Sequence, residues 1–451
     1  MEDYLKYNEE KTEVIGFYEG LQGDVVIPDG IQKIGNRAFY RCDAITSIVI
    51  PDTVRRIGHH AFEECHGLVS VHLPSELTRI NSSLFRFCTS LKTINIPEGI
   101  TEIYPMAFQY CFRLKSITIP KGIKAIGKAA FMNCDFESII LPYGLDTIEE
   151  STFSNCNNLT NVEIPNSVKK IGDNAFSGCV SINDIDIPNS VESIGNHAFL
   201  LTKLESLKIP SSVTHIGKDI ANVENIYVSK NNQSFICEDG VLFSKDKQEL
   251  ILYPCYAVQA KYTIPKTVNK IADEAFNGCQ LHSIVIPESV TYIGNGAFEG
   301  SALRTIVLPE SITSIGKYVF KDSKLESISF PSSLTTISDY AFQGCDYLKV
   351  VDIPEGVNYI GEMAFYNCNR IETVYIPSTV KYIGKSAFGW THFTEMHIRI
   401  EDLQVMNENL DFLSSKRKED CTLYVPFGTK YAYSNHPFFR DFKMIITEDL
   451  I

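Results

Sequence analysis

Apolar residues recur along most of this chain in a unit of 22 or 23 residues. The unit has the pattern L-x-x-I-x-I-P-x-x-[VI]-x-x-I-G-x-x-A-F-x-x-C, and residues 91–111 are one copy of it. The proline of the unit lies at Pro28, Pro51, Pro74, Pro97, Pro120, Pro142, Pro165, Pro188, Pro210, Pro265, Pro287, Pro309, Pro331, Pro354 and Pro377. A fixed period of this length predicts a solenoid, in which each repeat forms one coil and the coils stack on one another.

Within one unit, the hydrophobic positions predict three short elements. The I-x-I part, such as Val162 and Ile164, alternates with a period of two and predicts a strand with one buried face. The proline that follows lacks a backbone donor, so the pairing of the strand ends there. The V-x-x-I-G part, such as Val168 and Ile171, predicts a crossing to the opposite wall of the coil. We expect A-F-x-x-C to form a short helical turn, which makes the predicted fold an α/β-type solenoid that is mostly β.

A phenylalanine lies 11 residues after the proline in 14 copies, from Phe39 to Phe388. If the coils stack in register, these rings form one continuous aromatic column. No coil can bury its apolar residues alone, and each depends on the coils on both sides. The phenylalanine and five aliphatic residues contribute on the order of 10 kcal/mol per coil before the cost of ordering is subtracted.

The regular array is interrupted once and is flanked by atypical ends. Between Pro210 and Pro265 the spacing is 55 residues, and turn signals such as Asp239-Gly240 predict one or two β-hairpins there. The C-terminal end predicts helical spacing over 401–420, a strand at 422–426, a helical start to 431–442 and a last strand at 443–447. The predicted domains are an N-terminal cap at 1–24, repeats at 25–222, a β-hairpin insert at 223–264, repeats at 265–400 and a C-terminal cap at 401–451.

Ten of the 13 cysteines share one position, 14 residues after the repeat proline. Other copies place Thr202, Ser301, Ser323 or Thr391 there, which indicates a small, weakly polar, buried group. Because these replacements do not come in pairs, we expect free thiols rather than disulfides between coils. The sequence has no C-x-x-C pair, so a zinc site of that type is not predicted.

Composition and charge narrow the possible partners. The net charge of −14 argues against nucleic acid and against anionic membrane surfaces. No apolar run approaches the roughly 18 residues that a membrane helix needs, so we expect no membrane insertion. The opening residues, MEDYLKYNEEK, lack the features of a signal peptide. The sequence therefore leaves open a cytoplasmic protein or an export segment that precedes Met1.

The residues offer no arrangement that predicts catalysis. The glycines are spread over the repeats, so there is no phosphate-binding loop. His59, His60, His66 and His72 lie in one repeat, but their spacing favours surface histidines over a metal site. We therefore predict no catalytic residue, no bound metal, no cofactor and no enzymatic activity.

Two rows of residues flank the buried strand positions and are the better candidates for a binding surface. Four residues before the proline the row is mostly hydroxyl-bearing, as at Ser70 and Thr93, which either forms a ligand-binding ladder or simply suits a crowded, curved sheet. Two residues before the proline the residue type varies from copy to copy. We expect this variable row to face the concave side, where solenoids commonly bind ligands. The predicted binding residues are His72, Asn95, Thr118, Glu163, Asp186, Lys208, Ser329, Asp352 and Tyr375.

Tyrosines are frequent in the later repeats. Tyr359, Tyr375 and Tyr382 lie in adjacent copies, and Tyr292 lies further back. Exposed tyrosines are favoured at protein interfaces. However, Tyr359 and Tyr382 follow their prolines by five residues, so their face can differ from that of Tyr375.

The repeated I-P-x-x-V-x-x-I-G-x-x-A-F-x-x-C units, the segment Asp239-Gly-Val-Leu-Phe243 and the segment Leu423-Tyr-Val-Pro-Phe-Gly428 resemble the BspA-like leucine-rich repeat family over about residues 25–451. The resemblance implies a right-handed leucine-rich-repeat solenoid without catalytic residues. It also implies a bacterial, secreted or surface-attached protein, often host-associated, that binds other proteins or mediates adhesion. The predicted function is therefore non-enzymatic binding of a protein or glycan, and the alternative is a structural spacer or assembly module with no ligand of its own.

Overall fold

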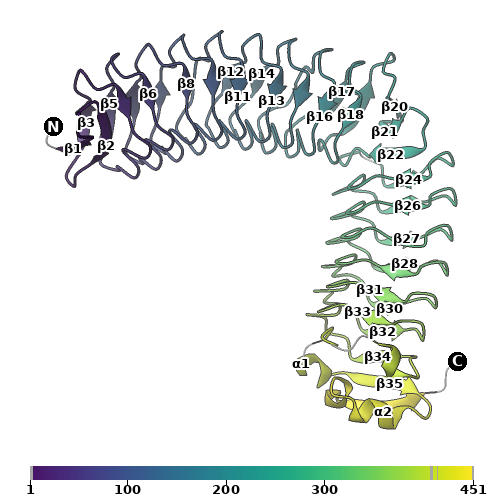
Figure 1. The fold of residues 1–451 in the computed structure, drawn as a ribbon. Coiled ribbons are helices and arrows are strands. Elements are labelled where there is room, and N and C mark those ends of the chain that lie inside the picture. The colour runs from purple at the N-terminus through teal and green to yellow at the C-terminus, as the bar shows by residue number, and fades with distance from the viewer. Residues whose placement is uncertain (1–3, 258, 407–409, 414, 449–451) are drawn as a thin grey trace. The chain divides into compact units, whose positions relative to one another are not determined.

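The computed structural model describes residues 4–257, 259–406, 410–413 and 415–448. The chain divides into two compact units, Met1–Ser234 and Phe235–Ile451. Each unit is a β-solenoid of stacked coils, and α-helices occur in the described residues only after residue 402 (Figure 1). Each coil has three walls, which are a first strand row, a second strand row and a wall of turns.

The first strand row contains the residues that precede the repeat proline. In the first unit it comprises β3 (Gly23–Val26), β5 (Ile45–Val49), β7 (Ser70–His72), β9 (Thr93–Ile94), β12 (Ser138–Ile140), β14 (Asn161–Glu163), β17 (Ser206–Ile209) and β19 (Asn225–Val228). In the second unit it comprises β23 (Lys261–Thr263), β25 (Ser283–Val285), β27 (Thr305–Val307), β28 (Ser327–Ser329), β30 (Val350–Asp352), β32 (Thr373–Ile376), β34 (Glu395–Ile398), β35 (Thr422–Pro426) and β36 (Met444–Glu448). Pairing within this row is parallel and joins successive coils, as expected for a solenoid.

The second strand row contains the isoleucine of the Ile-Gly pair. In the first unit it comprises β2 (Glu13–Phe17), β4 (Lys33–Ile34), β6 (Arg56–Ile57), β8 (Arg79–Ile80), β10 (Glu102–Ile103), β11 (Ala125–Ile126), β13 (Thr147–Ile148), β15 (Lys170–Ile171), β16 (Ser193–Ile194) and β18 (His215–Ile216), with β1 (Leu5–Tyr7) antiparallel to β2. In the second unit it comprises β22 (Glu249–Leu252), β24 (Lys270–Ile271), β26 (Tyr292–Ile293), β29 (Thr336–Ile337), β31 (Tyr359–Ile360) and β33 (Tyr382–Ile383). The glycine of this pair has a steric reason, because a Cβ added at Gly361 would lie 2.4 Å from the backbone nitrogen of Asp339 in the preceding coil.

The wall of turns contains A-F-x-x-C, and the prediction of a helical turn there is wrong. Two residues per coil adopt left-handed backbone, as His60 (φ 59°) and Glu64 (φ 59°) do on either side of Phe62. This conformation breaks a helix and points the intervening backbone at the next coil. The amide of Phe62 accordingly donates to the carbonyl of Leu84 in that coil (3.0 Å). The amide of Cys65, in contrast, donates to the carbonyl of Phe62 within the same turn (3.3 Å), so the segment alternates between bonds to the next coil and bonds of tight turns.

The predicted aromatic column is present in each unit. Neighbouring rings from Phe39 to Phe199 have centroids 5.1–5.7 Å apart, and those from Phe276 to Phe388 are 5.0–5.4 Å apart. All 14 rings are fully buried. The continuous column shows that the coils within each unit stack in register.

The shared cysteine position lies beside the column. The thiol of Cys88, for example, donates to the carbonyl of Phe62 in the preceding coil (3.1 Å). The hydroxyl of Thr202 instead donates to Phe199 of its own coil (2.8 Å). This buried position therefore holds a small side chain that donates either to the preceding coil, as Cys88 does, or to its own coil, as Thr202 does. All 13 cysteines are free.

The interruption of the array is built from antiparallel hairpins. β20 (Phe235–Glu238), β21 (Val241–Ser244) and β22 pair in succession, and Leu250 of β22 pairs with Ile271 of β24 in the first full coil. Tyr253 then takes the position of the column phenylalanine, 5.1 Å from Phe276.

The C-terminal end agrees with prediction in its later elements. The predicted strands are β35 and β36, and the predicted helical start is α2 (Lys430–Asn435), which is followed by η3 (Phe439–Asp441). Over 401–420 the structure has only η2 (Leu403–Val405) and α1 (Ser415–Lys418), while residues 407–409 and 414 of the predicted helical region lie outside the described residues.

Candidate binding surface

The variable row is brought into register by strand pairing. Val49 pairs with His72, Ile140 with Glu163, and Asp352 with Tyr375. Paired strands lie about 4.8 Å apart and alternate residues share a face, so these side chains form continuous lines on the outside of the first strand row. We call this surface the strand face.

The structure places all nine predicted binding residues on the strand face. Tyr375 is half-buried and the other eight are exposed. Thr118 and Asp186 differ from the rest, because the residues around them, 115–119 and 182–188, are not in described strands, whereas Asn95 directly follows β9. The row is therefore interrupted at these two coils.

A groove of about 740 Å³ opens at the second interruption. It runs between residues 160–166 and 183–189 and contains two predicted residues, Glu163 and Asp186, together with Asp184. No described backbone hydrogen bond joins residues 183–187 to a neighbouring coil. Asparagines complete its polar lining, at Asn161, Asn166, Asn183 and Asn189, and no lysine or arginine lines it. The groove therefore carries three carboxylates and offers acceptors to a partner.

In the second unit the strand face ends in three stacked aromatic rings. The centroids of Tyr375 and His397 are 4.4 Å apart, and those of His397 and Tyr424 are also 4.4 Å apart. Nδ1 of His397 lies 2.9 Å from a carboxylate oxygen of Glu448. Counting back from the repeat proline found Tyr375 but missed His397, because its strand has no proline. It also missed Tyr424, which lies two residues before Pro426 in the segment assigned to the C-terminal cap. The register of β34 and β35 is what adds them to the row.

The other sequence candidates separate onto different walls. Tyr359 and Tyr382 stack on each other in the second strand row, 4.8 Å apart, whereas Tyr375 lies in the first row. In the hydroxyl row, Ser47 donates to the carboxylate of Asp24 (2.6 Å), and this bond helps to hold the pKa of Asp24 below its usual value. The hydroxyl of Ser47 therefore already has a hydrogen-bond partner within the protein.

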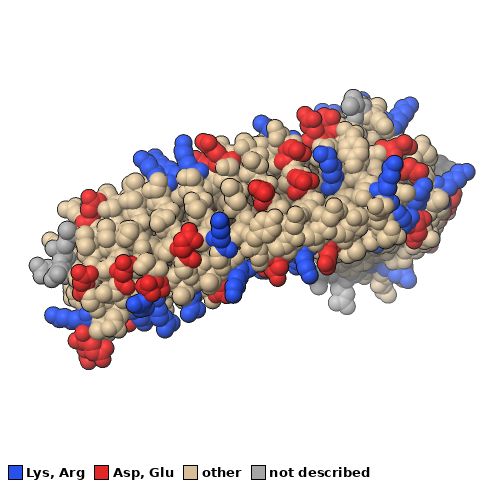
Figure 2. Space-filling model, turned by 90° about the horizontal axis from the view of Figure 1, so that it is seen from above, with Lys and Arg blue, Asp and Glu red and all other residues tan. Residues whose placement is uncertain are grey.

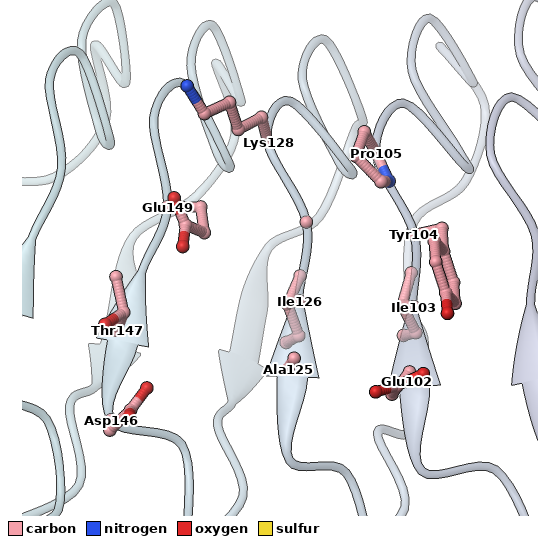
Figure 3. Close-up of a pocket in the computed structure, with 11 residues that line it drawn as sticks. Glu102, Ile103, Tyr104, Pro105, Ala125, Ile126, Lys128, Asp146, Thr147 and Glu149 are labelled. Atoms are coloured by element: carbon pink, nitrogen blue, oxygen red, sulfur yellow. The ribbon is translucent and has the colours of Figure 1, made fainter.

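A smaller cleft of about 350 Å³ lies in the second strand row (Figure 3). Its floor includes the buried Ile103 and Ile126, and carboxylates of Glu102 and Asp146 lie towards one end. Lys128, at the other end, pairs with Glu150 (2.9 Å). The cleft opens where the pairing of β11 with β10 is not continued to β13.

The histidines that are close in sequence do not converge. Nδ1 of His60 lies 2.8 Å from Glu63, which is buried and also contacts Arg86. His66 pairs instead with Asp43 (2.8 Å), and His72 belongs to the strand face. His60, His66 and His72 thus act separately, in local hydrogen bonds or at the surface.

Acidic and basic side chains are interspersed on the face of the molecule shown in Figure 2. This mixed pattern differs from the continuous basic surface that nucleic-acid binding requires. Among the described residues, no helix combines the length and the apolar character needed to cross a bilayer.

The solved structures that are similar to this chain include bacterial leucine-rich repeat proteins. A leucine rich cell surface protein from Faecalibacterium prausnitzii is 27% identical, with a TM-score of 0.48 and coverage of 88% of this chain and 93% of that one. A leucine-rich repeat protein from Bacteroides ovatus is 26% identical, with a TM-score of 0.46 and coverage of 84% and 94%. The pneumococcal vaccine antigen PcpA is 22% identical, with a TM-score of 0.43 and coverage of 97% and 92%. No curated protein matches the chain.

The family comparison is decisive. The model of the BspA type leucine rich repeat region matches residues 15–136, 124–236 and 269–395, which together make up most of the chain. These ranges contain the coils, the aromatic columns and nearly all of the strand face described above. The protein is thus a member of the BspA-type leucine-rich repeat family.

Proposed function

We propose that the protein is a non-enzymatic binding protein, secreted or held at a bacterial cell surface, whose strand face binds a host protein or glycan in adhesion. The observation that carries this proposal is the in-register variable row, which presents different exposed side chains on a uniform scaffold. Family membership supports binding at the cell surface as the general role.

The groove at Glu163, Asp184 and Asp186 indicates which kind of partner surface the protein would bind. Three carboxylates without a lining cation favour a partner that presents lysine or arginine side chains. Ile140, which pairs with Glu163 across the sheet, is 73% exposed and supplies an adjacent apolar contact. An apolar anchor beside charged groups is the usual composition of a protein interface, so we expect a protein with a basic and apolar surface.

The test compares two surfaces of the same protein. The variant Glu163→Gln/Asp184→Asn/Asp186→Asn with Ile140→Ser removes the groove chemistry from exposed positions, so the fold should be retained. Its matched control, Glu102→Gln/Asp146→Asn, removes carboxylates from the second strand row. Each protein is immobilised and exposed to extracellular-matrix extract and to mucin, and bound material is quantified.

We expect wild type and control to retain a ligand that the groove variant loses by tenfold or more, which is about 1.4 kcal/mol. Retention should also fall as salt increases, because the contacts are exposed charges. Equal retention by the groove variant would refute the assignment of the surface. Retention of nothing by wild type would favour the alternative, a structural spacer.

A further inference from the structure

A pocket of about 510 Å³ lies on the wall of turns at the end of the second unit. It is lined by Tyr366 and Trp390 from the last two coils, and by Asp411 and Arg417 from the C-terminal segment. The amide of Ser386 donates to the carbonyl of Asp411 (2.7 Å), and that of Phe388 donates to Phe412 (3.0 Å). Residues 411–412 therefore take the place of the next coil, and this pairing positions Asp411 at the pocket.

Trp390 is the only tryptophan in the chain, and its side chain is 66% exposed. It occupies the second left-handed position of its coil, with φ of 57°. The preceding coils of this unit place there residues that are small or tolerate this backbone, namely Gly278, Gly300, Asp322, Gly344 and Asn367. The first unit has bulky residues at the same position, but there Phe87 and Tyr110 stack on each other (4.4 Å). Among the described residues Trp390 has no such ring partner, so the exposed face of its indole is open to a ligand.

The polar groups of the pocket supply an acceptor and a donor. The carboxylate of Asp411 is exposed and forms no ion pair with the described residues. The guanidinium of Arg417 donates to Nε2 of His392 (2.8 Å), which holds it in place and leaves further N–H groups for other acceptors. One negative and one positive group line the same pocket. A charged ligand would be attracted by one of them and repelled by the other, so a net charge of either sign adds little to its binding free energy.

We propose that this pocket binds an uncharged sugar residue. The C–H groups on one face of a pyranose ring would pack on the negative face of the Trp390 indole. Ring hydroxyls would donate to Asp411 and accept from Arg417. The volume falls within the range of about 300–1,000 Å³ that is typical of small-molecule pockets. The pocket lies on the wall of turns, whereas the strand face is built on the first strand row, so this site is additional to the proposed function.

The single tryptophan makes the test specific, because fluorescence excited at the indole reports only on this pocket. The full chain is titrated with galactose, glucose, mannose, N-acetylglucosamine and N-acetylgalactosamine, and in parallel with N-acetyltyrosinamide and sialic acid. Oligosaccharides are screened on a glycan array. The variants Asp411→Ala and Arg417→Ala retain the fluorophore and remove one polar partner each.

The matched variant Trp390→Asn replaces the indole with a residue that suits left-handed backbone, so its stability should equal or exceed that of wild type. We expect a saturable fluorescence change with at least one neutral sugar, and a loss of affinity of about tenfold or more in each polar variant. Trp390→Asn should lose the glycans that wild type retains on the array.

Absence of a saturable change with any neutral sugar, together with equal array binding by wild type and Trp390→Asn, would overturn the proposal. A response only to N-acetyltyrosinamide would also overturn it and would indicate a site for an aromatic peptide side chain. A response only to sialic acid would show that the ligand is an anion instead. The result for the groove variant of the strand face does not affect this test, so each of the two proposals can fail without the other.

Discussion

Truncating one ring of the aromatic column tests how the coils support one another. Phe108 is fully buried, and its centroid lies 5.5 Å from those of both Phe85 and Phe131. Phe108→Ala removes the contacts with both neighbours and leaves a cavity that the stacked coils cannot easily close. We expect the free energy of unfolding to fall by about 3–5 kcal/mol, with the stacking pairs placing it in the upper part of that range. Phe108→Leu retains most of the volume and should cost about 1–2 kcal/mol.

The assay has a global and a local part. Urea denaturation followed by far-UV circular dichroism measures the loss of stability, and hydrogen exchange measured by mass spectrometry locates it. The amides of Phe85 and Phe108 donate across coils to Ala107 and Ala130 (2.8 Å each), so they should lose protection in the variant. The amide of Phe39, bonded to Ala61 (2.8 Å), is further along the array and should retain more.

This gradient follows from nearest-neighbour coupling, because each coil contacts only the coils beside it. Equal loss of protection at Phe39 would show that the first unit unfolds as one block. A loss of stability below about 1 kcal/mol would show that the column does not carry the burial assigned to it.

Three further predictions concern single positions. Gly361→Ala should destabilise the protein by about 1–3 kcal/mol in thermal melts, because its Cβ would meet the backbone of the preceding coil. A Cβ at Gly278 would meet no atom within 4 Å, so Gly278→Ala should cost only the left-handed backbone penalty of about 1–2 kcal/mol. The reverse order of the two losses would refute the steric explanation. Ser301→Ala should be neutral or stabilising by up to about 1 kcal/mol in urea titrations, because the buried Ser301 hydroxyl finds no hydrogen-bond partner among the described residues; clear destabilisation would reveal one. Burial raises the pKa of Cys42 from 9.0 to about 11, so the stability that its protonated thiol contributes is complete below pH 9 and is lost as the pH rises towards 11. Melts across this pH range should therefore fall less steeply in Cys42→Ala, and identical slopes would contradict the assignment.

Much of the scaffold was predictable because packing in a solenoid is local and periodic. The register of Phe39 to Phe199, the position of the shared cysteines and the strand face all follow from distances along one repeated unit. A residue at a given place in one coil meets the same place in the next, so the row containing His72 and Glu163 could be identified without coordinates. The prediction for the turns was wrong, because A-F-x-x-C has the apolar spacing of a helical turn, while left-handed residues divide it into tight turns and alternate amides donate to the next coil.

The sequence by itself thus determined the repeating architecture, the aromatic columns and the line of variable side chains, since each depends only on the period. Only the tertiary structure decided that β34 and β35 extend that line with His397 and Tyr424, and that Asp411 and Arg417 meet Trp390 in one pocket. Tyr424, Asp411 and Arg417 come from the C-terminal segment, and their meeting with residues of the last coils depends on the path of the chain after the repeats. No period connects such residues, so their positions follow only from the packing of the whole C-terminal segment.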